Sequence, residues 1–216
     1  MAKKPRRGAA PRRKAAAGTG DPIIDAAFRL AESRGWADVA LRDIAAEAGV
    51  PFSQLYGRFT SKQAVLDAFS RQVDQQLLAG SESDPSEGSA RDRLFDMVMR
   101  RLDLLQPHRE ALRSIARATR REPLSLACRL CSLRRAMAST LEAAGISAGG
   151  LEGCVRVKGL TAIYLSVLRR WFDDDSEDRA GTMAHLDRML HRVDNCLGRL
   201  RWRRGRPREE SAVGAA

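Results

Sequence analysis

The chain of 216 residues is 44% hydrophobic and 30% charged, so it can bury a sizeable core, either as one domain or as a small domain joined to a larger one. It contains no apolar run of about 18 residues, and no apolar stretch follows its basic N-terminus. We therefore expect no membrane insertion, no signal peptide and a cytoplasmic location.

The formal net charge of +11 lies mostly at the two ends of the chain. Residues 1–20 carry seven Lys and Arg side chains and no acid, and residues 201–216 carry five Arg and two Glu. Because residues 1–20 have almost nothing to bury, we expect a disordered basic arm, acting either as a solubilising tail or by contacting DNA phosphates. Residues 21–70 hold seven acids and five bases, so DNA binding there depends on where the cations lie.

The first helix is predicted over residues 22–34. Asp21 can cap it, Pro22 suits its first position, and Gly35 can end it. Its apolar positions follow the helical period and are expected to form a small core with Trp36: Ile23, Ala27, Leu30 and Ala31.

Two short helices joined by a tight turn are predicted next. The apolar positions of the first share one face: Leu41, Ile44, Ala45 and Ala48. Gly49 suits the left-handed position after a helix end, and Pro51 suits the first turn of a second helix that keeps Leu55 and Phe59 on one face. This pattern, from Ala40 to Phe59, is typical of a helix-turn-helix, whose second helix can enter the major groove of DNA.

The residues around this turn read DIAAEAGVPFSQLYGRFTSKQAVLDA, which resembles the DNA-binding domain of TetR-type bacterial transcription regulators. The matching elements are Ile44-Ala45, Ala48–Val50, Leu55-Tyr56, Phe59 and Ser61-Lys62. The resemblance covers roughly residues 21 to 75 and implies a three-helix DNA-binding domain. Ala40 and Pro51 stand where the family usually has Ser or Thr, so each short helix lacks an N-cap worth ~1 kcal/mol, and Asp38 is expected to cap the first instead.

Side-chain chemistry and position in the TetR-type pattern together suggest the base contacts. Arg42 corresponds to a DNA-contacting position of the family and would favour guanine. Ser53 and Gln54 lie near the start of the recognition helix, where Gln suits adenine. Phe52 has two alternatives, which are contact with a thymine methyl group or packing beside Phe59 in the core.

Tyr56, Arg58 and Lys62 are the expected phosphate contacts, which fix the register of a protein on DNA. Gly57 weakens a helix by up to ~1 kcal/mol relative to Ala, so we explain its presence by close approach to DNA. With the base contacts, these residues make double-stranded DNA the expected partner.

The C-terminal part of the chain reads as helices only. A helix over residues 61–78 ends the DNA-binding domain, residues 21–79, and the polar segment GSESDPSEGSA at 80–90 is the predicted linker. Residues 91–200 are expected to form a larger helical domain, whose last helix begins near Ser176.

In TetR-type proteins the last two long helices pair with those of a second copy, and the preceding helices enclose a small-molecule pocket. The resemblance therefore implies a homodimer and an effector, with pocket or dimer contacts on apolar residues of the last two helices: Leu160, Tyr164, Leu168, Trp171, Leu186, Leu190, Val193 and Leu197. The C-terminal half is also similar to ubiquinone-biosynthesis accessory proteins, which share the TetR fold and bind lipid. This suggests an apolar effector of the lipid or quinone class; alternatively, these faces are only core and dimer interface.

Two further patterns carry weaker signals. Cys128 and Cys131 resemble half of a zinc motif, but like Cys154 and Cys196 they are expected to be buried free thiols. No nucleophile is paired with a base, so we expect no enzyme, no metal and no cofactor.

The tail at residues 201–216 contains RGRPR and resembles an AT-hook, which would contact a narrow A·T minor groove through Arg204, Gly205, Arg206 and Pro207. Its alternative is a disordered tail that acts by charge alone.

These observations predict an all-α, TetR-like homodimer, with an N-terminal three-helix helix-turn-helix domain and a larger helical domain for ligand binding and dimerisation. We expect a transcription regulator at the nucleoid, acting as a ligand-responsive repressor of a palindromic operator. The alternative function is a lipid- or quinone-binding accessory protein of ubiquinone biosynthesis that retains the helix-turn-helix.

Overall fold

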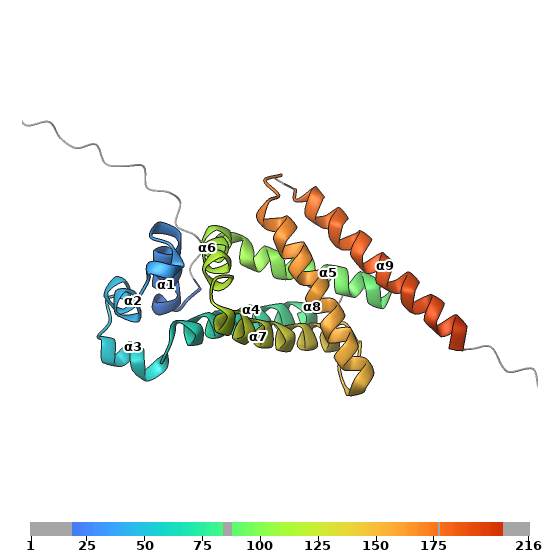
Figure 1. Cartoon of the computed structure of the whole chain (residues 1–216), viewed down its shortest axis with the longest axis horizontal. Helices are drawn as coiled ribbons and strands as arrows, with labels where there is room; N and C mark the ends of the chain where they lie inside the picture. Colours follow the sequence, from blue (N-terminus) through green and yellow to red (C-terminus); the bar gives the residue numbers. More distant parts are fainter. Residues whose placement is uncertain (1–18, 84–87, 177, 205–216) are drawn as a thin grey trace, which may run out of the picture. The chain divides into compact units, whose positions relative to one another are not determined.

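The computed structural model of the chain describes residues 19–83, 88–176 and 178–204. These residues form α-helices joined by turns and two short 3₁₀ helices, and none of them lies in a β-strand (Figure 1). The all-α prediction is therefore confirmed. No helix in this part of the chain is long and apolar enough to cross a membrane.

The elements follow one another in the order α1 Pro22–Ser33, η1 Trp36–Asp38, α2 Leu41–Ala48, α3 Phe52–Arg58, α4 Lys62–Ser83, α5 Ala90–Leu105, η2 Gln106–His108, α6 Arg109–Thr119, α7 Pro123–Ala143, α8 Gly150–Phe172 and α9 Ala180–Arg204. They divide into two compact units. The first holds the described residues up to Arg71 together with Leu105–Ala127, and the second holds Gln72–Leu104 together with the described residues from Cys128 onward.

The first unit is built around α1. This helix packs against both α2 and α6, and α2 packs in turn against α3. Asp21 caps α1 as predicted, because its carboxylate accepts a hydrogen bond from the Ile23 N–H at 3.0 Å. Trp36 is buried, and its backbone N–H donates a hydrogen bond to the Ser114 hydroxyl of α6 at 3.0 Å. The small core therefore includes α6, a helix that the sequence places in the C-terminal domain.

The C-terminal end of α2 is as the sequence predicts, but its N-terminal cap is not. Gly49 ends α2 with a φ of 69°, the left-handed conformation predicted for it. Asp38 does not cap this helix: it lies in η1, and the carboxylate of Asp43 accepts the hydrogen bond from the Ala40 N–H at 2.8 Å. The acid that supplies the cap therefore lies inside the first turn, where it also favours the positive end of the helix dipole.

His108 is half-buried against the core of the first unit, although nothing in the sequence marked it. Its ring packs edge-on against Phe28 and Phe69, with ring centroids 5.0 and 5.3 Å apart. This burial lowers the pKa of His108, and the nearby carboxylates of Asp25 and Glu32 oppose that shift only in part. The folded first unit therefore favours a neutral imidazole.

In the second unit α8 packs along α9. Arg101 is buried there, paired with Asp74 and with its guanidinium carbon 5.7 Å from the ring centroid of Tyr164.

The last helix begins at Ala180, not near Ser176. The carboxylate of Asp174 accepts from the N–H and hydroxyl of Thr182, at 2.7 and 2.6 Å, and also from Ser176.

Asp174, in the turn before α9, is ionised more readily than an ordinary aspartate because of its hydrogen bonds. Four hydrogen-bond donors from Ser176 and Thr182 hold the pKa of Asp174 well below its usual range. The Asp174 carboxylate thus connects Ser176, in the turn, to Thr182, at the start of α9.

The lowered pKa of His108 makes the stability of the protein depend on pH. The folded-state pKa lies below the unfolded value of 6.5, so the unfolded chain binds the proton more readily, and the free energy of unfolding should fall as pH decreases below about 6.5. His108→Gln, which cannot titrate, should remove that part of the decrease. The measurement is denaturant unfolding between pH 8 and 5; parallel curves for the two proteins would contradict the prediction.

Candidate nucleic-acid interface

The candidate interface is the outer face of α2 and α3. Helix α3 has only seven residues, and within it Leu55 alone is buried, with no exposed surface. Phe59, directly after the helix, is also buried. Because these two anchors occupy the inner side of α3, its remaining side chains face outward.

The outward residues of this face are among those predicted to contact bases or phosphates or to approach DNA closely. Arg42, Phe52, Ser53, Gln54, Tyr56 and Gly57 are all exposed. Phe52 and Tyr56 are 39% and 51% exposed, and their ring centroids are 5.8 Å apart. The alternative that Phe52 packs in the core is therefore wrong.

Arg42 joins α2 to this aromatic pair. Its guanidinium carbon lies 5.4 Å from the ring centroid of Phe52, a cation–π distance. A cation and two aromatic rings thus form one exposed surface across both helices, which we call the Arg42–Phe52–Tyr56 face. Such a surface offers a positive charge, a phenol hydroxyl and apolar contact area to a groove.

Gly57 lies on the same helix with open space beside it. A Cβ placed there would meet no heavy atom of the protein within 4 Å. Neither internal packing nor an unusual φ requires glycine at this position. Contacts within the chain therefore do not explain why glycine is present at position 57, whereas close approach of DNA would.

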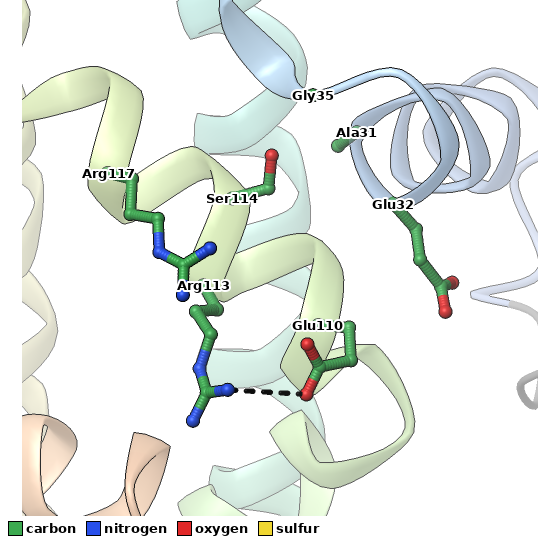
Figure 2. Close-up of a pocket in the computed structure, with 7 residues that line it drawn as sticks. All are labelled: Ala31, Glu32, Gly35, Glu110, Arg113, Ser114 and Arg117. Carbon is green, nitrogen blue, oxygen red and sulfur yellow. Dashed lines mark ion pairs between the residues drawn. The ribbon is translucent and has the colours of Figure 1, made fainter.

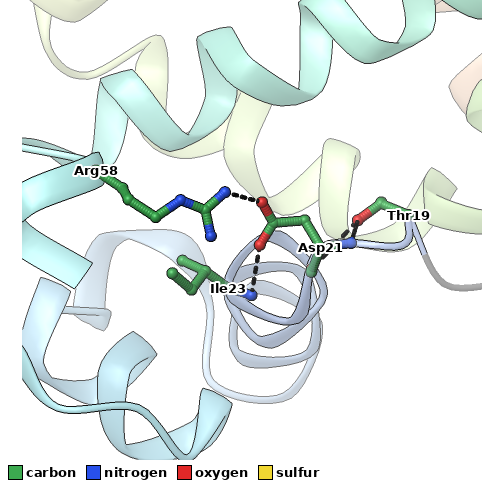
Figure 3. A network of polar contacts seen from close by, with 4 residues as sticks. All are labelled: Thr19, Asp21, Ile23 and Arg58. Atoms are coloured by element: carbon green, nitrogen blue, oxygen red, sulfur yellow. Dashed lines mark hydrogen bonds and ion pairs between the residues drawn. The ribbon is translucent and has the colours of Figure 1, made fainter. Parts of the chain in front are cut away.

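Arg58 is predicted as a phosphate contact, but in the free protein its guanidinium pairs with the carboxylate of Asp21 (Figure 3). The pair joins the last residue of α3 to the residue that caps α1. Figure 3 also shows the Ile23 N–H donating to the other carboxylate oxygen of Asp21. Arg58 therefore has an internal partner.

Lys62 is also occupied within the first unit. Its ammonium group donates to the backbone carbonyl of Trp36 at 3.0 Å and lies 5.1 Å from the centroid of the Trp36 ring. Its side chain is half-buried. The role of Lys62 in DNA binding stays a prediction.

The predicted basic ends lie mostly beyond the described residues. The arm at 1–18 is outside them, as are Gly205, Arg206 and Pro207 of the AT-hook-like motif. Helix α9 extends through Arg204, whereas the sequence places its end near Leu200. The predicted linker is shortened by helices, because α4 continues to Ser83 and α5 begins at Ala90.

The apolar residues predicted for the effector pocket or dimer contacts lie mostly inside the second unit. Leu168 is half-buried, Val193 is 40% exposed, and the side chain of Leu197 is outside the described part. The others are buried within the single chain: Leu160, Tyr164, Trp171, Leu186 and Leu190. Contact with a second copy would therefore fall to other, exposed residues of the same helices, which include Leu151, Val155 and Leu165.

The cysteines differ from the sequence prediction. Cys128, Cys131 and Cys154 are exposed on the single chain, not buried, while the side chain of Cys196 is outside the described residues. The predicted apolar faces of α7 and α8 are wider than the buried stripes of these helices. This is the reason the burial prediction failed.

A pocket of about 290 Å³ lies within the first unit, beside α6 (Figure 2). Its lining residues are Ala31, Glu32, Gly35, Glu110, Arg113, Ser114 and Arg117. Arg113 and Glu110 are 4.0 Å apart and form an ion pair on the same helix. Charges of both signs line this pocket, so it does not match the apolar effector expected from sequence.

The comparisons with known proteins agree with this geometry. The family model described as bacterial regulatory proteins of the tetR family matches residues 23–69, which include α2 and α3. No curated protein matches the chain.

Two solved structures illustrate the similarity over most of the chain. The TetR transcriptional regulator from Nitrosomonas europaea ATCC 19718 is 28% identical, with a TM-score of 0.67 over 80% of this chain and 96% of that one. A TetR transcriptional regulator from Rhodococcus sp. RHA1 shares the fold at 19% identity, with a TM-score of 0.56 over 79% and 92% of the two chains. Residues 23–69 thus match the helix-turn-helix domain of the tetR family of bacterial regulatory proteins, and most of the chain has the fold of solved TetR transcriptional regulators.

Proposed function

We propose that the protein is a repressor that binds a palindromic operator as a homodimer and is released by an apolar effector. The observation that carries the DNA-binding part is the exposed Arg42–Phe52–Tyr56 face, whose residues make their contacts to one another on the surface of α2 and α3. The alternative, a lipid- or quinone-binding accessory protein of ubiquinone biosynthesis that retains the helix-turn-helix, assigns no role to this exposed surface. The face therefore favours DNA binding over the accessory-protein alternative.

A dimer is part of the proposal because one recognition helix reads only a half-site. Exposed apolar residues on α8 support pairing with a second copy: Leu151 is 90% exposed, Val155 68% and Leu165 42%. Leu151 and Val155 are one helical turn apart, and Leu165 lies ten residues beyond Val155, so with 3.6 residues per turn all three fall within about 80° of one another on one side of the helix. Burying this stripe against its symmetry mate would remove it from water.

The basic arm and tail extend the proposal to the DNA backbone. Within residues 21–70 the acids outnumber the bases, and Arg58 and Lys62 already have internal contacts. We propose that the arm at residues 1–20 supplies much of the phosphate neutralisation, and that the tail around Arg206 adds minor-groove contacts. In the cell this places the protein in the cytoplasm, at the nucleoid.

The experiment that tests the function is selection of bound duplexes from a randomised pool by the purified full-length protein. We expect enrichment of a palindrome whose half-sites are about one helical turn apart. Enrichment of no sequence over scrambled DNA at moderate ionic strength would contradict the proposed function. Mass spectrometry of co-purified small molecules would identify an effector class.

Gly57→Ala should separate stability from DNA binding. Because open space surrounds the new methyl group, the variant should unfold up to ~1 kcal/mol less readily than the wild type. If the duplex backbone approaches this position, the same methyl group should weaken binding by about tenfold, as overpacked contacts do. Gly80→Ala in α4 is the matched control, since its Cβ also meets nothing within 4 Å. Equal affinity of the Gly57 and Gly80 variants would refute close approach at Gly57.

Gln54 and Tyr56 should differ in what they control. Gln54→Ala should change which sequences are preferred, by a factor of about 5 to 150 at one base pair, because a bidentate contact discriminates between bases. Tyr56→Phe removes one hydroxyl from a predicted phosphate contact and should weaken all sequences alike. Binding measured across a set of single-base variants of the selected duplex distinguishes them; the opposite pattern would overturn both assignments.

The dimer surface can be tested on α8. Val155→Glu combined with Leu165→Glu places two charges on the exposed stripe and should produce a folded monomer, as measured by light scattering and circular dichroism. Leu124→Glu on α7, where Leu124 is 78% exposed, is the control for adding a charge to an exposed apolar site. A double variant that stays dimeric would place the interface elsewhere.

A further inference from the structure

The contact between Asp21 and Arg58 gives the end of the recognition helix a fixed partner. Asp21 is almost completely buried, with 11% of its side chain exposed, whereas Arg58 is about half exposed. One carboxylate oxygen of Asp21 accepts from the Ile23 N–H at 3.0 Å, and the other accepts from the Arg58 guanidinium (Figure 3). Both oxygens of this acid are thus engaged.

The two charges occupy the helix ends that suit them. Asp21 lies at the N-terminus of α1, where the helix dipole favours an anion, and Arg58 lies at the C-terminus of α3, where it favours a cation. If Arg58 left Asp21 to reach a phosphate, a buried carboxylate would lose its counter-ion. The arrangement therefore favours retention of the ion pair when DNA binds.

The length of α3 gives this ion pair a mechanical role. A helix of seven residues is too short to be stable without packing, and only Leu55 within it is buried. Arg58 ties the far end of α3 to α1, and its guanidinium carbon also lies 5.0 Å from the centroid of the buried Phe59 ring. The direction of the exposed face thus depends on contacts at Leu55, Phe59 and Arg58.

Hydrogen bonds made by Thr19 fix the position of Asp21, the acid that Arg58 binds. The Asp21 N–H donates to the Thr19 hydroxyl at 3.3 Å, and the Thr19 N–H donates to the Asp25 carboxylate at 2.6 Å. These bonds hold the capping turn against α1. Asp21 is consequently held in place, and its ion pair with Arg58 can fix the orientation of α3.

We propose that Arg58 is a positioning residue, which Asp21 holds so that α3 presents its outer face to the major groove, and that it is not a phosphate contact. This inference rests on the proposed DNA-binding function. It replaces the sequence-based assignment of Arg58 with a role inside the protein.

The two roles predict opposite effects for Asp21→Asn. Asn is as good an N-cap as Asp, so this variant keeps the hydrogen bond to Ile23 and removes both the charge and the acceptor oxygen that hold Arg58. If Arg58 positions α3, then D21N and R58Q should each weaken binding to the selected duplex by roughly threefold to thirtyfold, because less of the protein has α3 correctly oriented. The double variant should bind no worse than either single variant.

The salt dependence of affinity separates positioning from phosphate contact. Loss of a positioning residue leaves the slope of log affinity against log salt unchanged, whereas loss of one phosphate contact reduces it by about 1. A smaller slope for R58Q, or equal or tighter binding by D21N, would overturn the proposal. Asp38→Asn removes an exposed acid from the same unit and controls for the change in net charge.

Hydrogen–deuterium exchange of the free protein tests the inference without DNA. D21N and R58Q should raise exchange in α3 to a similar extent, while D38N should not. Unchanged exchange in α3 would overturn the positioning role even if DNA binding is normal. Failure to select any duplex, with exchange in α3 raised as expected, would instead refute the proposed function.

Discussion

The burial of Leu55 is the contact on which the candidate interface depends. Seven residues cannot form a stable helix alone, so α3 exists because one side chain with no exposed surface joins it to the core of the first unit. The side chains of Phe52, Ser53, Gln54 and Tyr56 are then exposed at the surface. A short helix with a single internal anchor is well suited to present contacts outward, but its direction must be fixed by flanking residues.

Most of the charged side chains discussed in the first unit make contacts within the protein that stabilise its structure. Asp21 and Asp43 cap helices, Arg58 pairs with Asp21, and Lys62 binds the carbonyl of Trp36. Arg42 is the cation that lies on the outer face itself, against Phe52. This division fits a protein in which the helix-turn-helix reads shape and bases, while the basic ends of the chain add attraction to the backbone.

Much of the fold could be predicted from local sequence. Asp21, Pro22 and Gly49 mark helix ends through effects that operate within one turn, so the positions of α1 and α2 follow from residue type and spacing. The exposed set on α2 and α3 also came from local periodicity, with the TetR-type pattern supplying the roles. The family domain and the shared fold confirmed that pattern.

The remaining features depend on contacts between residues far apart in the chain. The packing of α6 on α1, the partner of Arg58 and the burial of His108 each join segments that no local pattern connects. The exposure of Cys128 and Cys131 has a related cause, because hydrophobic residue type does not reveal which side of a helix its neighbours cover. The start of α9 was missed because Asp174 reaches forward to Thr182, eight residues away.

The most direct test of the account is photo-crosslinking of the full-length protein to its selected duplex, with a photoreactive phenylalanine analogue placed at Phe52 or, as a control, at Leu126 of α7. Both positions are exposed to the same extent, 39%. The account predicts crosslinks to bases within each half-site from position 52 and none from position 126. Crosslinks from position 126 with none from position 52 would contradict the claim that α2 and α3 form the DNA-binding surface.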